Sequence, residues 1–290
     1  MKLKPSDVQE FYNMLEKEGR VDKKGGLATG TIRHIHNILN PAMKQAVKEK
    51  LVSNNVIADT VPPKVVRVRE ARSLNKKEVS IYLNELREHR FFAAFVLDSA
   101  IVLRRGELLG LQWPDLDFKT GILNIERQVS REIHEDGTPS SLEYSPLKTP
   151  KSYRSIILPE IVLDVLKSHK EQQLKEKHRL GSVYRDENLI FPNQLGEKLD
   201  TRHLYRIHSK VLKDTGIEHT AFHNLRHSVA SLLNQAGVDR KSRQELLGHA
   251  DGETTDDYTH VLDEMKIATS NKIGVIMQEV LGVQQEANPN

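Results

Sequence analysis

Arginine, histidine and tyrosine side chains recur at short spacing in the last quarter of the chain. His223 is followed by Arg226 and His227, and His249 precedes Tyr258 by nine positions. Arginine can bind a phosphate through two parallel hydrogen bonds, histidine moves protons near neutral pH, and tyrosine can act as a covalent nucleophile. These side chains alone could form a phosphoryl-transfer site that needs no metal.

One arginine in the middle of the chain lies where the surrounding pattern predicts burial. If the segment around Arg104 is helical, the arginine falls within an apolar stripe formed by Leu97, Ile101, Leu108 and Leu111. A buried guanidinium needs a partner, and Glu107, three residues later, could supply one. The pair is either purely structural, or it holds Arg104 toward a phosphate.

The basic residues at 223–227 fall on one side of a predicted helix. Its buried face is formed by apolar residues at helical spacing: Leu225, Val229, Leu232, Leu233 and Ala236. His223, Arg226 and His227 lie on another side, one turn apart, and can converge on one ligand. The alternative is a solvated basic helix face.

Composition narrows the class of protein. At 290 residues, 38% hydrophobic and 29% charged, the chain can bury the core of one large domain or two ordinary ones. It has no cysteine, which excludes disulfides and thiolate chemistry and suits a reducing cytoplasm. No apolar run is long enough to span a membrane. The net charge of +3 permits a nucleic-acid partner without requiring one.

The sequence predicts a mainly α protein of two domains with a small antiparallel β-sheet. Residues 1–61 form a helical domain whose second helix should be kinked or ended by Pro41. Residues 62–72 are basic and proline-containing, as in a linker. Residues 73–290 form the second domain.

The second domain should begin with a helical region from Ser73, its expected N-cap, to Trp113. Three strands are predicted next, at 121–129, 142–147 and 153–158, the last two on either side of a turn. The rest is expected to be helical almost to the end of the chain.

Four segments, taken in order, resemble the conserved boxes of the tyrosine recombinases, the family of phage and conjugative-transposon integrases. They are Leu103–Trp113, Leu147–Thr149 before the strand that ends at Pro159, His223–His227, and Leu247–Ala250 followed by Tyr258–Val261. Each segment alone is a weak signal, whereas four in the right order are specific. The resemblance covers the second domain and, more loosely, the first.

The resemblance implies a metal-independent enzyme for site-specific DNA recombination, with six catalytic residues: Arg104, Lys148, His223, Arg226, His249 and Tyr258. Tyr258 would attack phosphorus and form a 3′-phosphotyrosyl link. Arg104, supported by Glu107, and Arg226 would bind the non-bridging oxygens.

The other three residues would move or donate protons. His223 would accept the tyrosine proton, His249 would donate a hydrogen bond to the phosphate, and Lys148 would protonate the leaving 5′ oxygen. Lys151 is an alternative to Lys148. The covalent link conserves the phosphodiester energy, so no metal, ATP or other cofactor is implied.

The resemblance also implies double-stranded DNA as the partner and a homo-oligomer of two to four protomers on it. The expected DNA contacts are Lys23, Lys24, Arg33, Lys64, Arg67, Arg69, Arg72 and His227. A solvated linker is the alternative for residues 62–72, and His227 could instead serve packing. The C-terminal helix would dock on a neighbouring protomer, as in the family, or fold back on its own domain.

The chain departs from the family pattern at three places. Ile101-Val102 stands where Thr-Gly is usual, Asn55-Val56 replaces Asn-Pro, and Pro41 lies in a helix that is normally unbroken. The chain also begins directly at the core-binding helices, which suggests a fragment or a shorter member. Two rival functions are a type IB topoisomerase and a DNA-binding protein of the same fold that has lost the chemistry.

Overall fold

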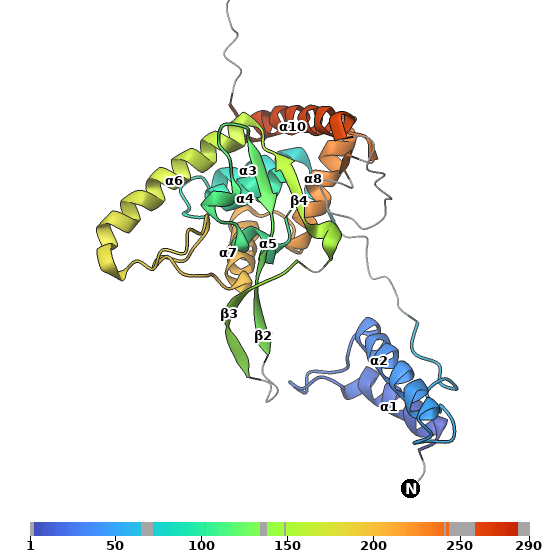
Figure 1. The fold of residues 1–290 in the computed structure, drawn as a ribbon. Helices are drawn as coiled ribbons and strands as arrows, with labels where there is room; N and C mark the ends of the chain where they lie inside the picture. Colours follow the sequence, from blue (N-terminus) through green and yellow to red (C-terminus); the bar gives the residue numbers. More distant parts are fainter. Residues whose placement is uncertain are drawn as a thin grey trace, which may run out of the picture. The chain divides into compact units, whose positions relative to one another are not determined.

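The computed structural model describes residues 3–64, 72–101, 103–133, 138–147, 149–240, 242–243 and 259–283. The chain divides into two compact units, Met1–Glu70 and Ala71–Asn290, each with its own hydrophobic core. The described residues are mostly helical with short antiparallel strand pairs, so the predicted mainly α class is confirmed (Figure 1).

The first unit is built on two helices, α1 (Pro5–Glu18) and α2 (Thr29–Lys48). Pro5 occupies the first helical position of α1, where its missing N–H costs nothing. The core between the helices contains Tyr12 and Ile32, together with Ile57 from the segment after α2. The hydroxyl of Tyr12 also hydrogen-bonds Nδ1 of His36 at 3.1 Å, which ties the helices together.

Helix α2 runs through Pro41 without a break, so the expectation that its first half ends there is wrong. Proline removes the hydrogen bond to the carbonyl of Asn37, and both residues are exposed, so water can satisfy that carbonyl. The apolar residues of α2 that pack on the core lie on the other side of the helix, among them Ile35 and Leu39.

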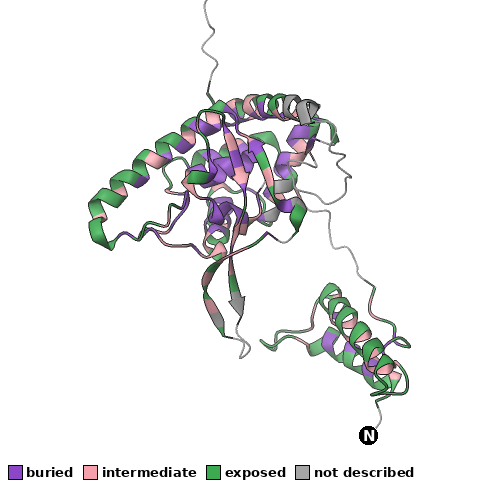
Figure 2. Cartoon of the chain, in the orientation of Figure 1, coloured by how far each residue is buried: buried purple, intermediate pink, exposed green. Residues whose placement is uncertain are grey.

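The second unit begins with three helices, whereas the sequence predicted one helical region up to Trp113. They are α3 (Lys76–Glu85), α4 (Phe92–Ile101) and α5 (Arg105–Gly110), followed by the 3-10 turn η1 (Trp113–Asp115). Asn75, not Ser73, caps α3, because its side chain accepts from the N–H of Glu78 at 3.0 Å. Helix α4 is mostly apolar, its residues Ala93–Ile101 are all buried, and it forms the centre of the core (Figure 2).

The strands form two separate antiparallel pairs within the described residues. β1 (Ile122–Ile125) pairs with β4 (Arg154–Ile157), and β2 (Gln128–Ile133) pairs with β3 (Pro139–Ser145). The strand expected at 121–129 is therefore interrupted before Gln128. The two later strands lie on either side of the turn between them, as predicted, but each pairs with an earlier strand, and that turn holds the 3-10 helix η2 (Pro150–Ser152).

The other helices of the described residues cover this core. They are α6 (Glu160–Leu180), the 3-10 turn η3 (Gly181–Val183), α7 (Thr201–Thr215), α8 (His223–Gln235) and α10 (Thr259–Leu281). Helix α10 packs on α3, α6, α8 and β4 of its own unit, with Ile273, Met277 and Val280 buried (Figure 1). In this structure the C-terminal helix thus folds back on its own domain. No helix in the described part of the chain is long and apolar enough to cross a membrane.

The segment that leads into α3 is hydrogen-bonded to α8. The buried N–H of Leu74 donates to Oγ of Ser228 at 2.7 Å, and the same hydroxyl donates to the carbonyl of Asn224 at 3.0 Å. The hydroxyl of Thr220 donates to the carbonyl of Arg72 at 2.7 Å. These bonds attach the start of the second unit to the helix that carries His223 and Arg226.

Replacing Ser228 with alanine should lower the free energy of unfolding by about 1–3 kcal/mol, because it leaves the buried N–H of Leu74 without an acceptor. Thermal unfolding of the purified chain measures the change. Ser155→Ala is the control, since the Ser155 hydroxyl, bound to Oδ1 of Asn124, is exposed. Equal melting temperatures for Ser228→Ala and the unmodified chain would show that the Leu74–Ser228 bond contributes nothing.

Candidate active site

Arg104 lies at the start of α5, where an extended backbone places it as the N-cap residue. Its Nη1 donates to Oε1 of Glu107 at 2.6 Å, and its backbone N–H donates to Oε2 of the same carboxylate at 3.1 Å. The side chain of Glu107 is 1% exposed and that of Arg104 is 37% exposed. The expected ion pair is therefore present, with the acid inside and the arginine reaching outward.

A second arginine, which the sequence analysis missed, shares this carboxylate. Arg154 on β4 donates from Nη2 to Oε2 of Glu107 at 3.0 Å, and its side chain is 8% exposed. The sequence did contain an indication of it, because Arg154 lies on the same face of the predicted strand as Ile156 and Leu158, and their apolar side chains mark that face as buried. An arginine on the buried face of a strand needs a partner in the same way as Arg104.

The two arginines determine the charge state of Glu107. Burial alone would raise the pKa of Glu107, but the charge of Arg154 and the hydrogen bonds from Arg104 and Arg154 hold it below its ordinary value. The ionised carboxylate thus stabilises the fold at pH values above its ordinary pKa. That stabilisation is lost as the pH falls through the lowered value.

The turn before β4 is connected to the same cluster. Nη1 of Arg104 lies 3.4 Å from Oγ of the fully buried Ser152, and that hydroxyl is 2.9 Å from Oγ1 of Thr149. Thr149 directly follows Lys148 in the sequence. A chain of hydrogen bonds therefore joins Arg104 to the residue beside the predicted general acid.

Arg104 opens into a hollow of about 680 Å³ on the surface of the second unit. Among the residues that the structure describes, the charged side chains lining it are four arginines and two aspartates, namely Arg104, Arg105, Arg131, Arg202, Asp98 and Asp200. Asp200 pairs with Arg202 at 2.8 Å and with Arg131 at 3.3 Å, and these hydrogen bonds and charges lower its pKa to about 2. The excess of arginine makes the hollow attractive to an anion.

Helix α8 begins at His223 and carries Arg226 one turn later, although the side chains of these two residues lie outside the described part of the structure. The expected apolar face is present, since Leu225, Val229 and Leu233 are buried. The residues next to Arg104 and His223 also meet, because the guanidinium carbon of Arg105 lies 6.0 Å from the ring centre of Phe222. The backbone thus brings the first and third resembling segments to one place.

The other predicted catalytic residues, Lys148, His249 and Tyr258, lie outside the described residues, as do Arg67, Arg69 and Val102. The same is true of the side chain of Lys151. Among the described residues, no cluster of three or more histidine and acidic side chains could hold a metal ion.

The predicted DNA contacts fall into two groups. Lys23, Lys24, Arg33, Lys64 and His227 are exposed. Arg72, in contrast, is bound within its own unit.

The guanidinium of Arg72 pairs with the carboxylates of Glu78 and Glu218, and its Nη1 also donates to the carbonyl of Glu218 at 3.1 Å. Arg72 is thus paired with two carboxylates, and its contact with DNA stays a prediction.

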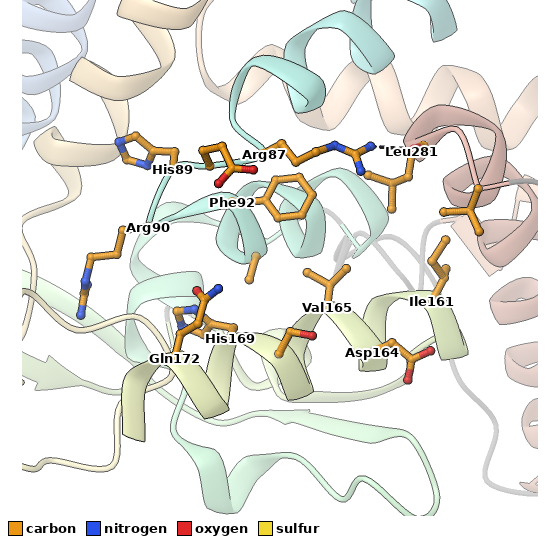
Figure 3. Close-up of a pocket in the computed structure, with 14 residues that line it drawn as sticks. Arg87, His89, Arg90, Phe92, Ile161, Asp164, Val165, His169, Gln172 and Leu281 are labelled. Carbon is orange, nitrogen blue, oxygen red and sulfur yellow. Dashed lines mark hydrogen bonds between the residues drawn. The ribbon is translucent and has the colours of Figure 1, made fainter. Parts of the chain in front are cut away.

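A second hollow, of about 480 Å³, lies where α10 ends against α6 and the start of α4 (Figure 3). Arg87 crosses it and donates from Nη2 to the carbonyl of Leu281 at 2.9 Å. This bond satisfies a carbonyl at the C-terminal end of α10. The bond therefore helps to hold the end of α10 on its own domain.

Comparison with known proteins decides the family. Residues 72–265 match the model of the Phage integrase family. The chain belongs to this family. The match spans Arg104, Glu107, Arg154 and the start of α8, and it confirms the resemblance noted in the sequence.

Similar proteins include recombinases and integrases. The chain is 31% identical over 278 residues to the "Tyrosine recombinase XerC-like" of Caldanaerobacter subterraneus, covering 91% of this chain and 69% of the relative. It is 28% identical over 219 residues to the integrase of Mycobacterium phage L5, covering 75% of this chain and 55% of the relative.

Solved structures show the same fold. The Tn1549 transposon integrase in complex with transposon right end DNA matches with a TM-score of 0.68 and 20% identity, covering 91% of this chain and 85% of that one. A lambda integrase dimer bound to a core site matches with a TM-score of 0.56 and 20% identity, covering 88% and 84%.

Replacing Glu107 with alanine should destabilise the second unit by about 3–5 kcal/mol, because two guanidinium groups lose their shared buried carboxylate. Denaturant unfolding measures the change. Glu126→Ala is the matched control, since Glu126 also pairs with an arginine, Arg127, but is 56% exposed and should contribute little. If both variants unfold at the same denaturant concentration, the buried position of Glu107 is unimportant for stability.

Proposed function

We propose that this tyrosine recombinase of the phage integrase family carries out site-specific recombination of double-stranded DNA through a covalent 3′-phosphotyrosyl intermediate. The observation that carries the proposal is the arrangement of Arg104. Its guanidinium is fixed from behind by the buried Glu107 and opens into an arginine-rich hollow, at the position where the family resemblance puts a phosphate ligand.

The chemical step is a transesterification. The hydroxyl of Tyr258 attacks the phosphorus, the bond to the 5′ oxygen breaks, and the phosphate remains joined to tyrosine through its 3′ side. His223 takes the tyrosine proton and Lys148 supplies the proton for the leaving oxygen, so the protons balance. A 5′-hydroxyl from a second strand then reverses the reaction and rejoins the DNA.

The remaining groups stabilise the charge that develops on the phosphate. Arg104 and Arg226 bind the non-bridging oxygens and His249 donates one more hydrogen bond. Arginine suits this task because its planar donors match two oxygens at once. The free energy of the broken phosphodiester is held in the tyrosine link, so the mechanism does not require ATP.

Double-stranded DNA is the proposed partner of both units. Lys23, Lys24 and Arg33 are exposed cations of the first unit, and the linker supplies Lys64, Arg67 and Arg69. Solved structures of the same fold hold an integrase bound to DNA, in one case as a dimer. A DNA substrate and a chain without cysteine suit the cytoplasm.

We also propose that a dimer or tetramer assembles on the DNA. The apolar face of α10 is occupied by its own domain through Ile273, Met277 and Val280. Contact between protomers through this apolar face therefore requires α10 to leave that position, whereas contacts through other surfaces do not.

A covalent adduct tests the chemistry. Duplexes that carry a nick beside a randomised segment are incubated with the chain, and protein-linked DNA is recovered under denaturing conditions and sequenced. Wild-type chain should enrich one sequence, and Tyr258→Phe should form no adduct because the nucleophilic oxygen is missing. Tyr205→Phe removes an exposed tyrosine of α7 and should behave as wild type.

An adduct that persists in Tyr258→Phe, or the absence of any adduct with the wild-type chain, would contradict the proposal. Relaxation of supercoiled plasmid that lacks the enriched sequence would instead indicate a type IB topoisomerase.

The affinity of the Tyr258→Phe variant for the enriched duplex should fall steeply as the salt concentration rises, because lysine and arginine side chains that bind phosphates displace the counterions of the DNA. Replacing Lys23, Lys24 and Arg33 together with alanine should reduce the slope of log affinity against log salt by about 3. Fluorescence anisotropy measures the slope. Arg20→Ala is the control, because Arg20 lies near the same loop but is paired with Asp22 at 2.7 Å. An unchanged slope in the triple variant would show that these three residues of the first unit do not contact DNA phosphates.

A further inference from the structure

The carboxylate of Glu107 is shared by two arginines with opposite exposure. Arg104 is 37% exposed and reaches the hollow, whereas Arg154 is 8% exposed and lies behind the carboxylate. A guanidinium as buried as that of Arg154 cannot lie along a DNA backbone. Its task must therefore be carried out through the groups that it touches, which are Glu107 and the turn before β4.

We propose that Arg154 is a positioning residue for DNA cleavage, which acts through Glu107 and Ser152 to hold Arg104 toward the scissile phosphate. This inference rests on the proposed function and names a residue whose side chain need not touch the substrate.

The geometry is a closed circuit of hydrogen bonds. Arg104 donates to Oε1 of Glu107 at 2.6 Å, and Arg154 donates to Oε2 at 3.0 Å. Nη1 of Arg154 also donates to the carbonyl of Ser152 at 3.0 Å, and Oγ of Ser152 lies 3.4 Å from Nη1 of Arg104. Arg154 is therefore bonded to the carboxylate that holds Arg104, and to the backbone of Ser152, whose hydroxyl lies beside the guanidinium of Arg104.

Charge balance gives Arg154 a second effect. One carboxylate shared by two guanidinium groups leaves the cluster with a net charge of +1. If Arg154 is removed, the single charge of Glu107 balances that of Arg104, and the pair attracts a phosphate less strongly. Arg154 thus allows Glu107 to orient Arg104 without cancelling its attraction for the DNA.

The same circuit predicts how cleavage depends on pH. Arg104 from α5 and Arg154 from β4 face the carboxylate of Glu107, and together they hold its pKa below the ordinary value against the effect of burial. Helix α5 also packs against β2 and α7, whose arginines Arg131 and Arg202 line the hollow with Asp200. Without Arg154, burial raises the pKa of Glu107, so a neutral carboxylic acid should form at higher pH.

The test compares Arg154→Met and Arg154→Lys with Arg127→Met. Arg127 is a matched control, since it pairs with the buried Asp115 at 2.5 Å in the same unit but does not contact the cluster. Three quantities are measured on the nicked duplex enriched by the wild-type chain. They are the rate of adduct formation against pH, the affinity in the Tyr258→Phe background, and the melting temperature.

Arg154→Met should slow adduct formation by about tenfold or more, as expected when a phosphate ligand is misplaced, and should move the acidic limb of the rate profile to higher pH. Its affinity for DNA should change by less than the rate. Arg154→Lys keeps the charge but not the planar pair of bonds, so its rate and acidic limb should be intermediate. Arg127→Met should lower the melting temperature without moving the acidic limb.

If Arg154→Lys forms the adduct at the wild-type rate and with the wild-type pH profile, the inference is overturned, even if Arg154→Met fails to fold. An acidic limb that moves equally in Arg127→Met would also overturn it, because the effect would then follow general destabilisation. If the wild-type chain itself forms no adduct, the proposed function fails. If it forms one and the Arg154 variants match it, only this inference fails.

Discussion

The structure of the candidate site depends on one buried charge, the carboxylate of Glu107. An ionised group that is 1% exposed is stable in a protein interior only when its oxygens are fully bonded, and here two arginines and a backbone N–H provide those bonds. The requirement joins α5 to β4, two elements far apart in the sequence. It also leaves the outer edge of the Arg104 guanidinium open to an anion.

Exposure gives the two arginines different tasks although their chemistry is the same. Arg154 is held behind the carboxylate, and Arg104 is held in front of it. A comparable buried contact holds α8 to the start of the second unit, because Oγ of Ser228 accepts a hydrogen bond from the N–H of Leu74. Buried polar contacts of this kind specify one geometry, because a small shift leaves a donor or an acceptor without a partner.

Much of this organisation could be predicted from the sequence. Periodicity predicted the mainly α class and the buried face of α8. The apolar residues around Arg104 predicted its pairing with Glu107, but the predicted burial of Arg104 was wrong, because α4 ends at Ile101 and Arg104 caps α5 with its side chain 37% exposed. Strand pairing could not be predicted, because β1 and β4 meet through contacts that no local pattern encodes. The predicted end of the helix at Pro41 was wrong, because Pro41 and Asn37 are exposed and water can satisfy the carbonyl that proline leaves unbonded. The sequence alone does not show this exposure. Arg154 was missed because its partner lies 47 residues away.

The proposed mechanism requires Tyr258 to become covalently linked to the 3′ phosphate of a cleaved strand. The most direct test is mass spectrometry of the adduct after digestion with nuclease and protease. We expect one modified peptide, with a nucleotide attached through its 3′ phosphate to the oxygen of Tyr258. Attachment at another residue, or through a 5′ phosphate, would contradict it.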